Sequence, residues 1–453
     1  MAIRRARWNG HSALGDLELD FRRDNDQAFR TIVIAGENGV GKTSILDSLS
    51  RLGESVIPEL HDLSFIEIDE PGVGFAQVSH SGERHTDLKG ALFNESGEEI
   101  TGESDKSRYL FNVAEGVLGR FRLRGIAYSR VRSGFRVGLI DSITTGERDW
   151  GKAKLDDSDD YTPVKQMLVN LRTQDDREFA QIAMQQDMVS WKAFYPRSKV
   201  CRFASSLNAF FDELAFDRVA QIDSYHQVLF KKHGCDIPID ALSTGEKQIV
   251  YRGSYLLDAL ENNEGGVVLV DEPELSMHPK WQQRILDYYR GLFPLGGDDP
   301  VQLIVATHSE YVLEAALNDP EGTLVIALED KGGVIVPNRI TAPYAPESLS
   351  ASEVNYRVFG IASTDYHVAL YGLMQSFTQA ESVVACDRFI AGQPAFDESR
   401  HARVSKHGAT EYRTLPTFIR NAIDHPDSGN RYSHEELVVS IELMQEIALR
   451  LRR

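Results

Sequence analysis

A glycine-rich stretch near the amino terminus has the residue types needed to hold phosphate groups. It consists of Gly36, Glu37, Asn38, Gly39, Val40, Gly41, Lys42 and Thr43, followed by Ser44. This fits the pattern G-x-x-x-x-G-K-[ST]. Its glycines let main-chain N–H groups turn toward phosphate oxygens, and a helix that starts after the loop adds its positive end. We therefore predict that this stretch binds ATP and Mg²⁺, with Lys42 on the β- and γ-phosphates and the Thr43 hydroxyl on the metal.

Two acidic residues follow a hydrophobic run much later in the chain. Asp271 and Glu272 come directly after residues 267–270, which are all valine or leucine. A carboxylate such as Asp271 is a hard oxygen ligand suited to Mg²⁺. Glu272 could accept a proton from an attacking water. On its own such a pair is more often a surface acidic turn. Together with the phosphate loop it predicts the metal ligand and the catalytic base of an ATPase.

A third polar group opens a helix before the acidic pair. Its members are Ser243, Thr244, Gly245 and Glu246. Serine followed three residues later by glutamate is the pattern of a capping box, a purely structural device. A helix start of this kind also offers N–H groups to a phosphate, so both interpretations stay open.

These residues must be positioned by alternating strands and helices. Residues 31–35, 266–270 and 302–306 are short hydrophobic runs typical of buried strands, and helices are predicted at 43–53, 247–257 and 279–292. Strands at 3–8 and 17–21 precede them, and a hairpin at 324–328 and 333–337 follows. Buried strands separated by helices imply an α/β fold with a largely parallel sheet covered on both faces.

The chain divides into four predicted parts. They are an ATPase lobe with the phosphate loop at 1–140, a helical insertion at 141–225, a second ATPase lobe at 226–345 and a mainly helical carboxyl-terminal domain at 346–453. The insertion has apolar residues at helical spacing as far as Phe216 and lacks a long heptad array, which predicts a compact lobe and no extended coiled coil.

The run Leu242–Glu246 resembles the L-S-x-G-[EQ] signature of ABC-class ATPases. In that class the signature of one subunit completes the ATP site of the other, so the resemblance implies a homodimer or a higher assembly. His308 follows the strand at 302–306 and resembles the switch histidine of the class, which contacts the γ-phosphate. The glutamine loop of the class has no clear counterpart. Gln77 lies early, and Tyr128–Arg132 contains no glutamine.

The residues after the acidic pair favour one branch of this class. Asp271-Glu272-Pro273-Glu274 leads to Met277-His278-Pro279, similar to the D-E-P-E-x-x-L-H-P stretch of prokaryotic ATPases related to the OLD nucleases, RecF and Septu PtuA. Transporter ATPases usually have D-E-P-T-x-x-L-D there. The resemblance implies ATP-gated action on nucleic acid or on an effector, in DNA repair or in anti-phage defence. It also admits a separately encoded nuclease and a phage-derived trigger as partners.

The tail contains Arg420-Asn421 and, four residues further on, His425. R-N-x-x-x-H before a final amphipathic helix resembles the HEPN ribonuclease motif of the PrrC and RloC anticodon nucleases, with tRNA as the implied substrate. Histidine could move a proton from a ribose hydroxyl, and arginine could stabilise the phosphorane charge. Five basic residues nearby could favour a phosphate backbone: Arg400, Arg403, Lys406, Arg413 and Arg431. The alternative is that Arg420 and His425 only pair with and cap a helix end.

Composition sets the remaining limits. The net charge of -19 excludes a protein that binds nucleic acid through its whole field, so any such binding must be local. A candidate patch has arginines at every second position or so, without acids between them: Arg120, Arg122, Arg124, Arg130, Arg132 and Arg136. Three dispersed cysteines (Cys201, Cys235 and Cys386) indicate a reducing cytoplasm and no zinc site. No apolar run approaches the ~20 residues of a membrane helix.

The sequence thus favours a defence-type ATPase whose ATP-dependent dimer controls a nuclease effector, in its own tail or in a partner protein. Two alternatives remain open. One is a RecF-like repair ATPase that binds DNA through the arginine patch, and the other is a regulatory scaffold without significant hydrolysis.

Overall fold

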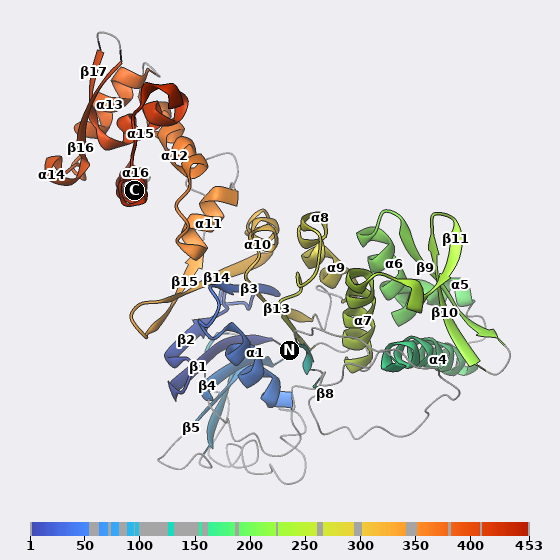
Figure 1. Cartoon of the computed structure of the whole chain (residues 1–453). Coiled ribbons are helices and arrows are strands. Elements are labelled where there is room, and N and C mark those ends of the chain that lie inside the picture. The colour runs from blue at the N-terminus through green and yellow to red at the C-terminus, as the bar shows by residue number, and fades with distance from the viewer. Residues whose placement is uncertain are drawn as a thin grey trace. The chain divides into compact units, whose positions relative to one another are not determined.

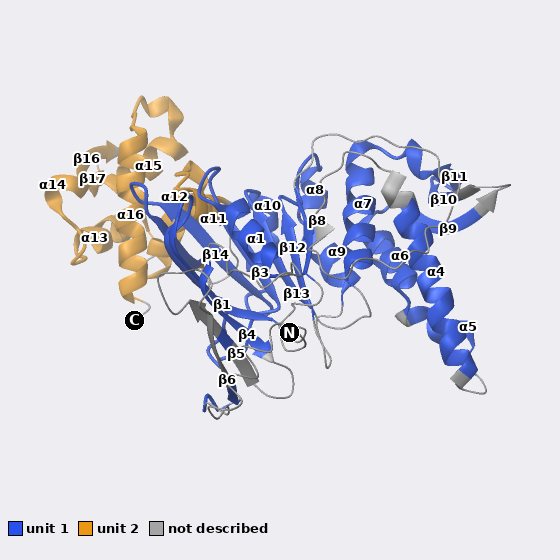
Figure 2. Cartoon of the chain, turned by 90° about the horizontal axis from the view of Figure 1, so that it is seen from below, with its two compact units in different colours: residues 1–339 blue, residues 340–453 orange. Residues whose placement is uncertain are grey.

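The structure is a computed structural model of the 453-residue chain. It describes residues 2–53, 63–70, 74–80, 88–94, 96–98, 126–130, 154–155, 162–185, 190–222, 225–260, 266–293, 301–340, 351–378, 382–407 and 410–451. They form two compact units, residues 1–339 and 340–453, which are coloured separately in Figure 2.

A seven-stranded sheet is the centre of the first unit, in the order β15-β14-β3-β13-β12-β7-β8. Its strands are β3 (Thr31–Gly36), β7 (Ile126–Ser129), β8 (Lys154–Leu155), β12 (Val267–Asp271), β13 (Gln302–Thr307), β14 (Thr323–Asp330) and β15 (Ile335–Ile340). The pairs β14–β3, β3–β13, β13–β12, β12–β7 and β7–β8 are all parallel. Strands β3, β12 and β13 are buried along their whole length, as a sheet covered on both faces requires. The predicted α/β class with a largely parallel sheet is therefore confirmed.

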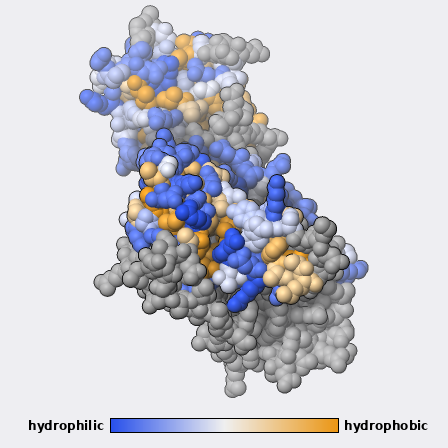
Figure 3. Space-filling view, turned by 90° about the vertical axis from the view of Figure 1, so that its right-hand side faces the viewer, coloured by the Kyte–Doolittle hydropathy of each residue, from blue (hydrophilic) through white to orange (hydrophobic). Residues whose placement is uncertain are grey.

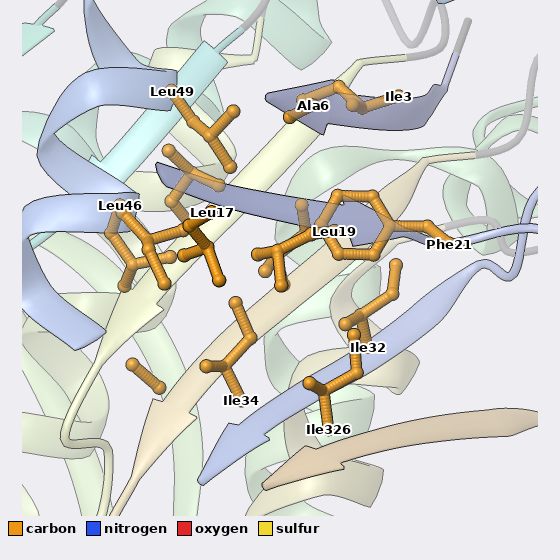
Figure 4. Close-up of a cluster of buried hydrophobic side chains, with 14 of the residues drawn as sticks. Ile3, Ala6, Leu17, Leu19, Phe21, Ile32, Ile34, Leu46, Leu49 and Ile326 are labelled. Carbon is orange, nitrogen blue, oxygen red and sulfur yellow. The ribbon is translucent and has the colours of Figure 1, made fainter. Parts of the chain in front are cut away.

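A second, antiparallel sheet has the order β2-β1-β4-β5-β6. Its strands are β1 (Ile3–His11), β2 (Gly15–Asp20), β4 (Leu63–Glu70), β5 (Gly74–His80) and β6 (Leu88–Asn94). Side chains from β1 and β2 meet those of β3 and of helix α1 (Lys42–Ser50) in one hydrophobic cluster. Figure 4 shows Leu17, Leu19 and Phe21 beside Ile32 and Ile34 in this cluster. Burying such side chains contributes about 1.5–3 kcal/mol each, so this core fixes where the phosphate loop begins.

The segment between β7 and the acidic strand contains helices and a small sheet. Its helices are α4 (Thr162–Gln185), α5 (Trp191–Phe194), α6 (Lys199–Phe210) and α7 (Thr244–Ala259), and Figure 1 shows α4, α6 and α7 as neighbours. Its antiparallel strands are β9 (Leu214–Ile222), β10 (Tyr225–Lys232) and β11 (Cys235–Pro238).

The predicted helical run to Phe216 is too long, because α6 ends at Phe210 and β9 starts at Leu214. Three apolar residues stay buried after α6 has ended: Phe211, Leu214 and Phe216. Because they continue the helical spacing of apolar residues, the sequence pattern extended the predicted helix too far.

The predicted helix at 279–292 is divided in two. Helix α8 (Pro279–Gln282) and helix α9 (Ile285–Leu292) are separated at Arg284, whose N–H bonds to Trp281 O at 3.1 Å, one residue short of helical spacing. The Arg284 side chain donates to Ala209 O and Asp212, which ties this break to the end of α6. Helix α10 (Glu310–Leu317) then follows β13.

The second unit is mainly helical, with one hairpin that was not predicted. Its elements are α11 (Ala351–Phe359), α12 (Thr364–Ser376), α13 (Val383–Ala391), α14 (Glu398–His401), β16 (Ala402–His407), β17 (Thr410–Thr414), α15 (Leu415–Asp424) and α16 (His434–Leu451). Leu370, Met374, Ile419, Ile441 and Met444 belong to its own hydrophobic cluster. The two units therefore have separate cores, and the chain passes from one to the other at 339/340.

Within the described ranges, every helix is too short or too polar to cross a bilayer. On the face shown in Figure 3, hydrophobic residues lie in small groups among hydrophilic ones.

Candidate functional site

The phosphate loop connects β3 to α1. Gly36 ends β3 with a φ of 155°, and a Cβ added there would lie 2.6 Å from Leu328 O on β14. Gly41 has a φ of 88°, and its Cβ would lie 2.2 Å from Leu14 Cδ2. Only glycine fits both positions, the first because of the neighbouring backbone and the second because of its left-handed conformation. Packing thus requires glycine at position 36, and the backbone conformation requires it at position 41.

The amino terminus of α1 is open toward the loop. Gly41 provides no side-chain cap, so the first N–H groups of the helix face the loop without a side-chain acceptor at the cap position. Lys42 is buried, and its Nζ donates to Gly36 O and Glu37 O at 2.8 Å each. Burial lowers the pKa of the Lys42 ammonium, while the carboxylates of Glu272 and Asp271 act in the opposite direction. The loop therefore holds a cation and unused N–H groups at one place, a combination that suits an anionic ligand.

The loop and the acidic strand meet through Thr43 and Asp271. Thr43 Oγ1 donates to Asp271 Oδ2 at 2.9 Å, although the two residues are far apart in the sequence. Burial raises the pKa of Asp271 to about 6, against the lowering effect of the Thr43 hydrogen bond, and Glu272 adds to the rise.

These two residues fit the predicted magnesium site. Asp271 Oδ1 is buried, and no group in the described part of the chain donates a hydrogen bond to it. An anionic oxygen of this kind is costly to bury without a cation or a donor. A hard cation next to Thr43 Oγ1 and Asp271 would satisfy it, so the donor set fits Mg²⁺.

Glu272 and His308 come together at the same edge of the sheet. His308 Nδ1 lies 3.2 Å from Glu272 Oε1, and their side chains are 43% and 22% exposed. Glu272 has a φ of 42°, a left-handed conformation that costs a non-glycine residue about 1–2 kcal/mol. Its N–H donates to Ala306 O at 2.9 Å, which holds this turn against the end of β13. The carboxylate thus stays accessible to solvent while its backbone is fixed.

The signature residues start α7. Ser243 caps the helix in a capping box with Glu246, so the structural function predicted for this pair is present. Lys232 Nζ also bonds to Glu246 at 2.7 Å. Burial raises the pKa of Glu246, but Lys232 and Ser243 outweigh it and the net pKa is lowered. Ser243 and Thr244 are exposed, whereas Gly245 is buried, so the first two remain available to a second molecule.

Two further predictions from this part of the sequence have partial outcomes. Gln77 lies within β5 and donates to Glu67 at 2.7 Å, so it belongs to the antiparallel sheet. Strand β7, which pairs with the acidic strand, ends at Ser129 and leads to Arg130. Of the six arginines in the candidate patch, only Arg130 lies in the described residues. Arg130 pairs with Asp47 of α1 at 2.9 Å.

In the tail, the candidate ribonuclease residues lie at the end of α15. Arg420 bonds to Asp424 at 2.7 Å and to Asn421 at 3.1 Å. His425 is exposed at the carboxyl cap of the same helix. Three of the five neighbouring cations have glutamate partners: Arg400 with Glu442, Arg403 with Glu436 and Lys406 with Glu411. Arg420 thus makes the local ion pair of the structural alternative.

Curated proteins that resemble this chain include one named as an ATPase and two Septu proteins. The chain is 30% identical over 192 residues to the "Retron Vc95 probable ATPase" of Vibrio cholerae serotype O1 biovar El Tor, covering 40% of this chain and 33% of that protein. It is 21% identical over 387 residues to the "Septu protein PtuA" of Bacillus thuringiensis, covering 80% and 85%. The identity to the PtuA of Bacillus mycoides (strain KBAB4) is 23% over 441 residues, covering 94% and 53%. The matched region is thus a third of the retron protein and about half of the second PtuA.

Among solved structures, two SMC head domains are similar, one bound to the C-winged helix domain of ScpA and one from Thermotoga maritima. Both have a TM-score of 0.39, with identities of 12% and 15%, covering 75% and 76% of this chain and 98% and 100% of those chains. The model of one family, described as "AAA domain, putative AbiEii toxin, Type IV TA system", matches residues 32–314. This range begins in β3 and ends in α10, and therefore includes the phosphate loop, the signature, the acidic strand and His308. The chain belongs to this AAA-domain family.

Proposed function

We propose that the chain is an ATP-hydrolysing, ATP-dependent dimer of an anti-phage defence system that controls a nuclease effector. The observation that carries the proposal is the meeting of the phosphate loop with both acidic residues and His308 at the carboxyl edge of adjacent strands. The similarity of the chain to a retron ATPase and to two Septu proteins supports the assignment to defence. The function is exercised in the cytoplasm.

In this proposal ATP binds with its phosphates over the amino terminus of α1. Lys42 would exchange its two carbonyl partners for the β- and γ-phosphates, and Thr43 and Asp271 would hold Mg²⁺, which would neutralise charge on these phosphates. Glu272 orients the attacking water and accepts its proton, and His308 contacts the γ-phosphate. The exposure of both side chains supports these functions.

The partner subunit completes the site through its own signature. Exposed Ser243 and Thr244 stand at the start of α7, where a helix terminus attracts the γ-phosphate of a facing molecule. ATP then lies between two subunits and holds them together until it is hydrolysed. Hydrolysis would therefore time how long the dimer persists.

The effector that we favour is a separately encoded nuclease. The hydrogen-bonded ion pair of Arg420 with Asp424 supports this choice over a ribonuclease in the tail, because an RNA phosphate would have to displace Asp424. The second PtuA, which is matched over about half its length, shows that relatives of this chain contain further sequence. Nucleic acid, DNA or tRNA, is then recognised by the complex and need not be held by this chain alone.

Two purified variants test the ATPase. Glu272→Gln should keep ATP binding, lower kcat by about 10²–10⁴-fold and accumulate an ATP-bound dimer. Lys42→Ala should bind ATP poorly and stay monomeric. Light scattering after gel filtration, with and without ATP and Mg²⁺, reads the dimer. A Glu272→Gln protein that remains monomeric with bound ATP contradicts the dimer.

A mixing experiment tests whether the signature acts across subunits. Lys42→Ala and Thr244→Glu are each expected to be inactive, because one spoils the phosphate loop and the other the exposed signature. Mixed dimers contain one composite site with both defects and one intact site. Mixing should thus restore part of the hydrolysis, and a mixture as inactive as its components would exclude a shared site.

A further inference from the structure

Glu274 is a buried carboxylate that belongs to the D-E-P-E stretch, but neither the sequence analysis nor the proposed function gives it a role. It lies three residues after Asp271 and is 4% exposed. Its Oε1 accepts hydrogen bonds from Thr307 Oγ1 at 2.6 Å and from the His308 N–H at 3.0 Å. Both donors belong to the segment that ends β13, so one carboxylate oxygen connects the acidic turn to the residues around His308.

The His308 side chain is held on the same side. Its Nδ1 lies 3.4 Å from Glu274 Oε1 and 3.2 Å from Glu272 Oε1. The main chain and the ring of His308 are thus both directed toward the acidic turn. Thr307 Oγ1 in turn accepts the N–H of Ser309 at 3.0 Å, which extends the network to the residue that caps α10.

Burying the Glu274 carboxylate destabilises the folded state, and the fold has no evident structural need for it. Glu274 Oε2 is buried, and within the described residues nothing donates a hydrogen bond to it. Replacing the pair of Glu274 and Thr307 by apolar residues of similar shape could be nearly neutral for stability. A buried carboxylate with one unpaired oxygen beside Glu272 and His308 is more consistent with positioning than with stability.

We propose that Glu274 is a positioning residue that fixes His308 against Glu272, so that both side chains meet the γ-phosphate in one geometry. The proposal rests on the ATPase function above, because it assigns Glu274 to the same site. Glu274 acts indirectly. It accepts the hydrogen bonds that hold His308, and it does not touch the reacting atoms. Without it, the segment Thr307–Ser309 loses its shared acceptor and His308 loses its fixed orientation.

The test compares Glu274→Ala with Glu274→Gln. Alanine removes the acceptor, whereas glutamine keeps a carbonyl oxygen that can accept the same two bonds. Glu274→Ala should lower kcat for ATP by about 10- to 100-fold, as expected when a catalytic group is misplaced by about 1 Å, with KM changed less than about threefold. Glu274→Gln should stay within about threefold of wild type in both constants.

A second measurement does not depend on hydrolysis. Exchange of the His308 amide hydrogen, read at single-residue resolution by mass spectrometry, should accelerate at least about tenfold in Glu274→Ala and stay slow in Glu274→Gln. The exchange result does not depend on nucleotide. If exchange at His308 accelerates in Glu274→Ala but the wild type does not hydrolyse ATP, the proposed ATPase function is refuted and the contact between Glu274 and His308 still stands.

Two outcomes overturn the proposal. One is an alanine variant with unchanged kcat despite faster exchange at His308. The other is a glutamine variant as slow as the alanine variant, since that would make the charge of Glu274 the essential property.

In a His308→Ala background, Glu274→Ala should lower kcat by less than about twofold more, because the two residues act as a unit. If Glu274→Ala fails to fold, Thr307→Val removes the shorter of the two hydrogen bonds to Glu274 and should show the same loss in kcat.

Discussion

Arg252 Nη1 donates to the main-chain oxygen of Asp271 at 2.8 Å, which joins the signature helix to the last residue of the acidic strand. Arg252 is 2% exposed, and its Nη2 lies 3.5 Å from Arg130 O, at the end of β7. One buried guanidinium therefore connects α7 to the carboxyl ends of two neighbouring strands. The position of Asp271 depends on this contact as well as on Thr43.

Replacing Arg252 by methionine, which has a similar length, should destabilise the first unit. The free energy of unfolding should fall by about 2–3 kcal/mol, because a hydrogen bond from a charged donor is lost and the carbonyl is left buried. All four tryptophans fall within residues 1–339, so their fluorescence during urea unfolding reports on this unit. Arg218, whose side chain is 52% exposed, is the control. Its change to methionine should stay within about 0.5 kcal/mol, and equal effects at both positions would contradict the argument.

Two helix glycines, Gly253 of α7 and Gly372 of α12, should respond in opposite ways to replacement by alanine. A Cβ at Gly253 would lie 2.0 Å from the hydroxyl of Tyr288, which donates to Ile249 O at 2.8 Å, whereas a Cβ at Gly372 of α12 meets nothing within 4 Å. Gly253→Ala should cost about 1–3 kcal/mol of unfolding free energy through overpacking. Gly372→Ala should stabilise by about 0.4–1 kcal/mol.

The same pair can be checked by a compensating change. Tyr288→Phe removes the atom nearest to the new Cβ, so the double variant Gly253→Ala with Tyr288→Phe should recover part of the loss. Urea unfolding of the single and double variants measures this recovery. Strictly additive losses would show that the Tyr288 hydroxyl is not the obstacle.

The second unit should lose stability in mild acid because of His367. Burial lowers the pKa of His367 from 6.5 to about 3, and its Nε2 lies 2.9 Å from Ser440 Oγ, at hydrogen-bond distance. The unfolded chain therefore binds the proton first as the pH falls. The contribution is complete above about pH 6.5 and is lost as the pH falls toward 3. At pH 5 the loss amounts to about 2 kcal/mol.

His367→Gln should remove this pH dependence. The test is urea unfolding at pH 7.5 and pH 5, read by pulsed hydrogen exchange of peptides from α12. Wild type should lose about 2 kcal/mol more than the variant between these pH values. The exposed His425, changed to glutamine, is the control and should keep the wild-type loss. A similar loss in the His367 and His425 variants would contradict the assignment.

The tail should not cleave RNA through Arg420 and His425. Arg420 is paired with Asp424 at 2.7 Å, so an RNA phosphate would have to compete with this carboxylate. In cells that express the system with its neighbouring genes, Arg420→Ala and His425→Ala should leave growth arrest and RNA integrity as in wild type. Lys42→Ala should abolish the response. Loss of RNA cleavage in either tail variant, with Lys42 intact, would restore the ribonuclease interpretation.

The sequence predicted the central sheet because each buried strand is a short β-branched run, and it predicted the phosphate loop because the pattern is local. It did not predict that Glu274 would bond to Thr307, since that contact depends on the register between β12 and β13. Periodicity also failed at Phe211, which stays buried after its helix has ended. The hairpin β16–β17 was missed because Ala402–His407 carries mixed polar residues and Val404 is 62% exposed, so no buried face marks the strand. Local motifs were thus readable, whereas contacts between distant segments were not.

The order of strands has a consequence for synthesis of the protein. Strand β3 ends at Gly36, but its two neighbours in the sheet are residues 302–307 and 323–330. A growing chain exposes both edges of β3 until these partners emerge, which takes tens of seconds at about 5–20 residues per second. For most of this interval Asp271 and Glu272 have not yet been made, and the phosphate loop has no strand of its own sheet beside it. In the function proposed above, the site that binds ATP is therefore completed only after His308 has been made, which places nucleotide binding late in folding.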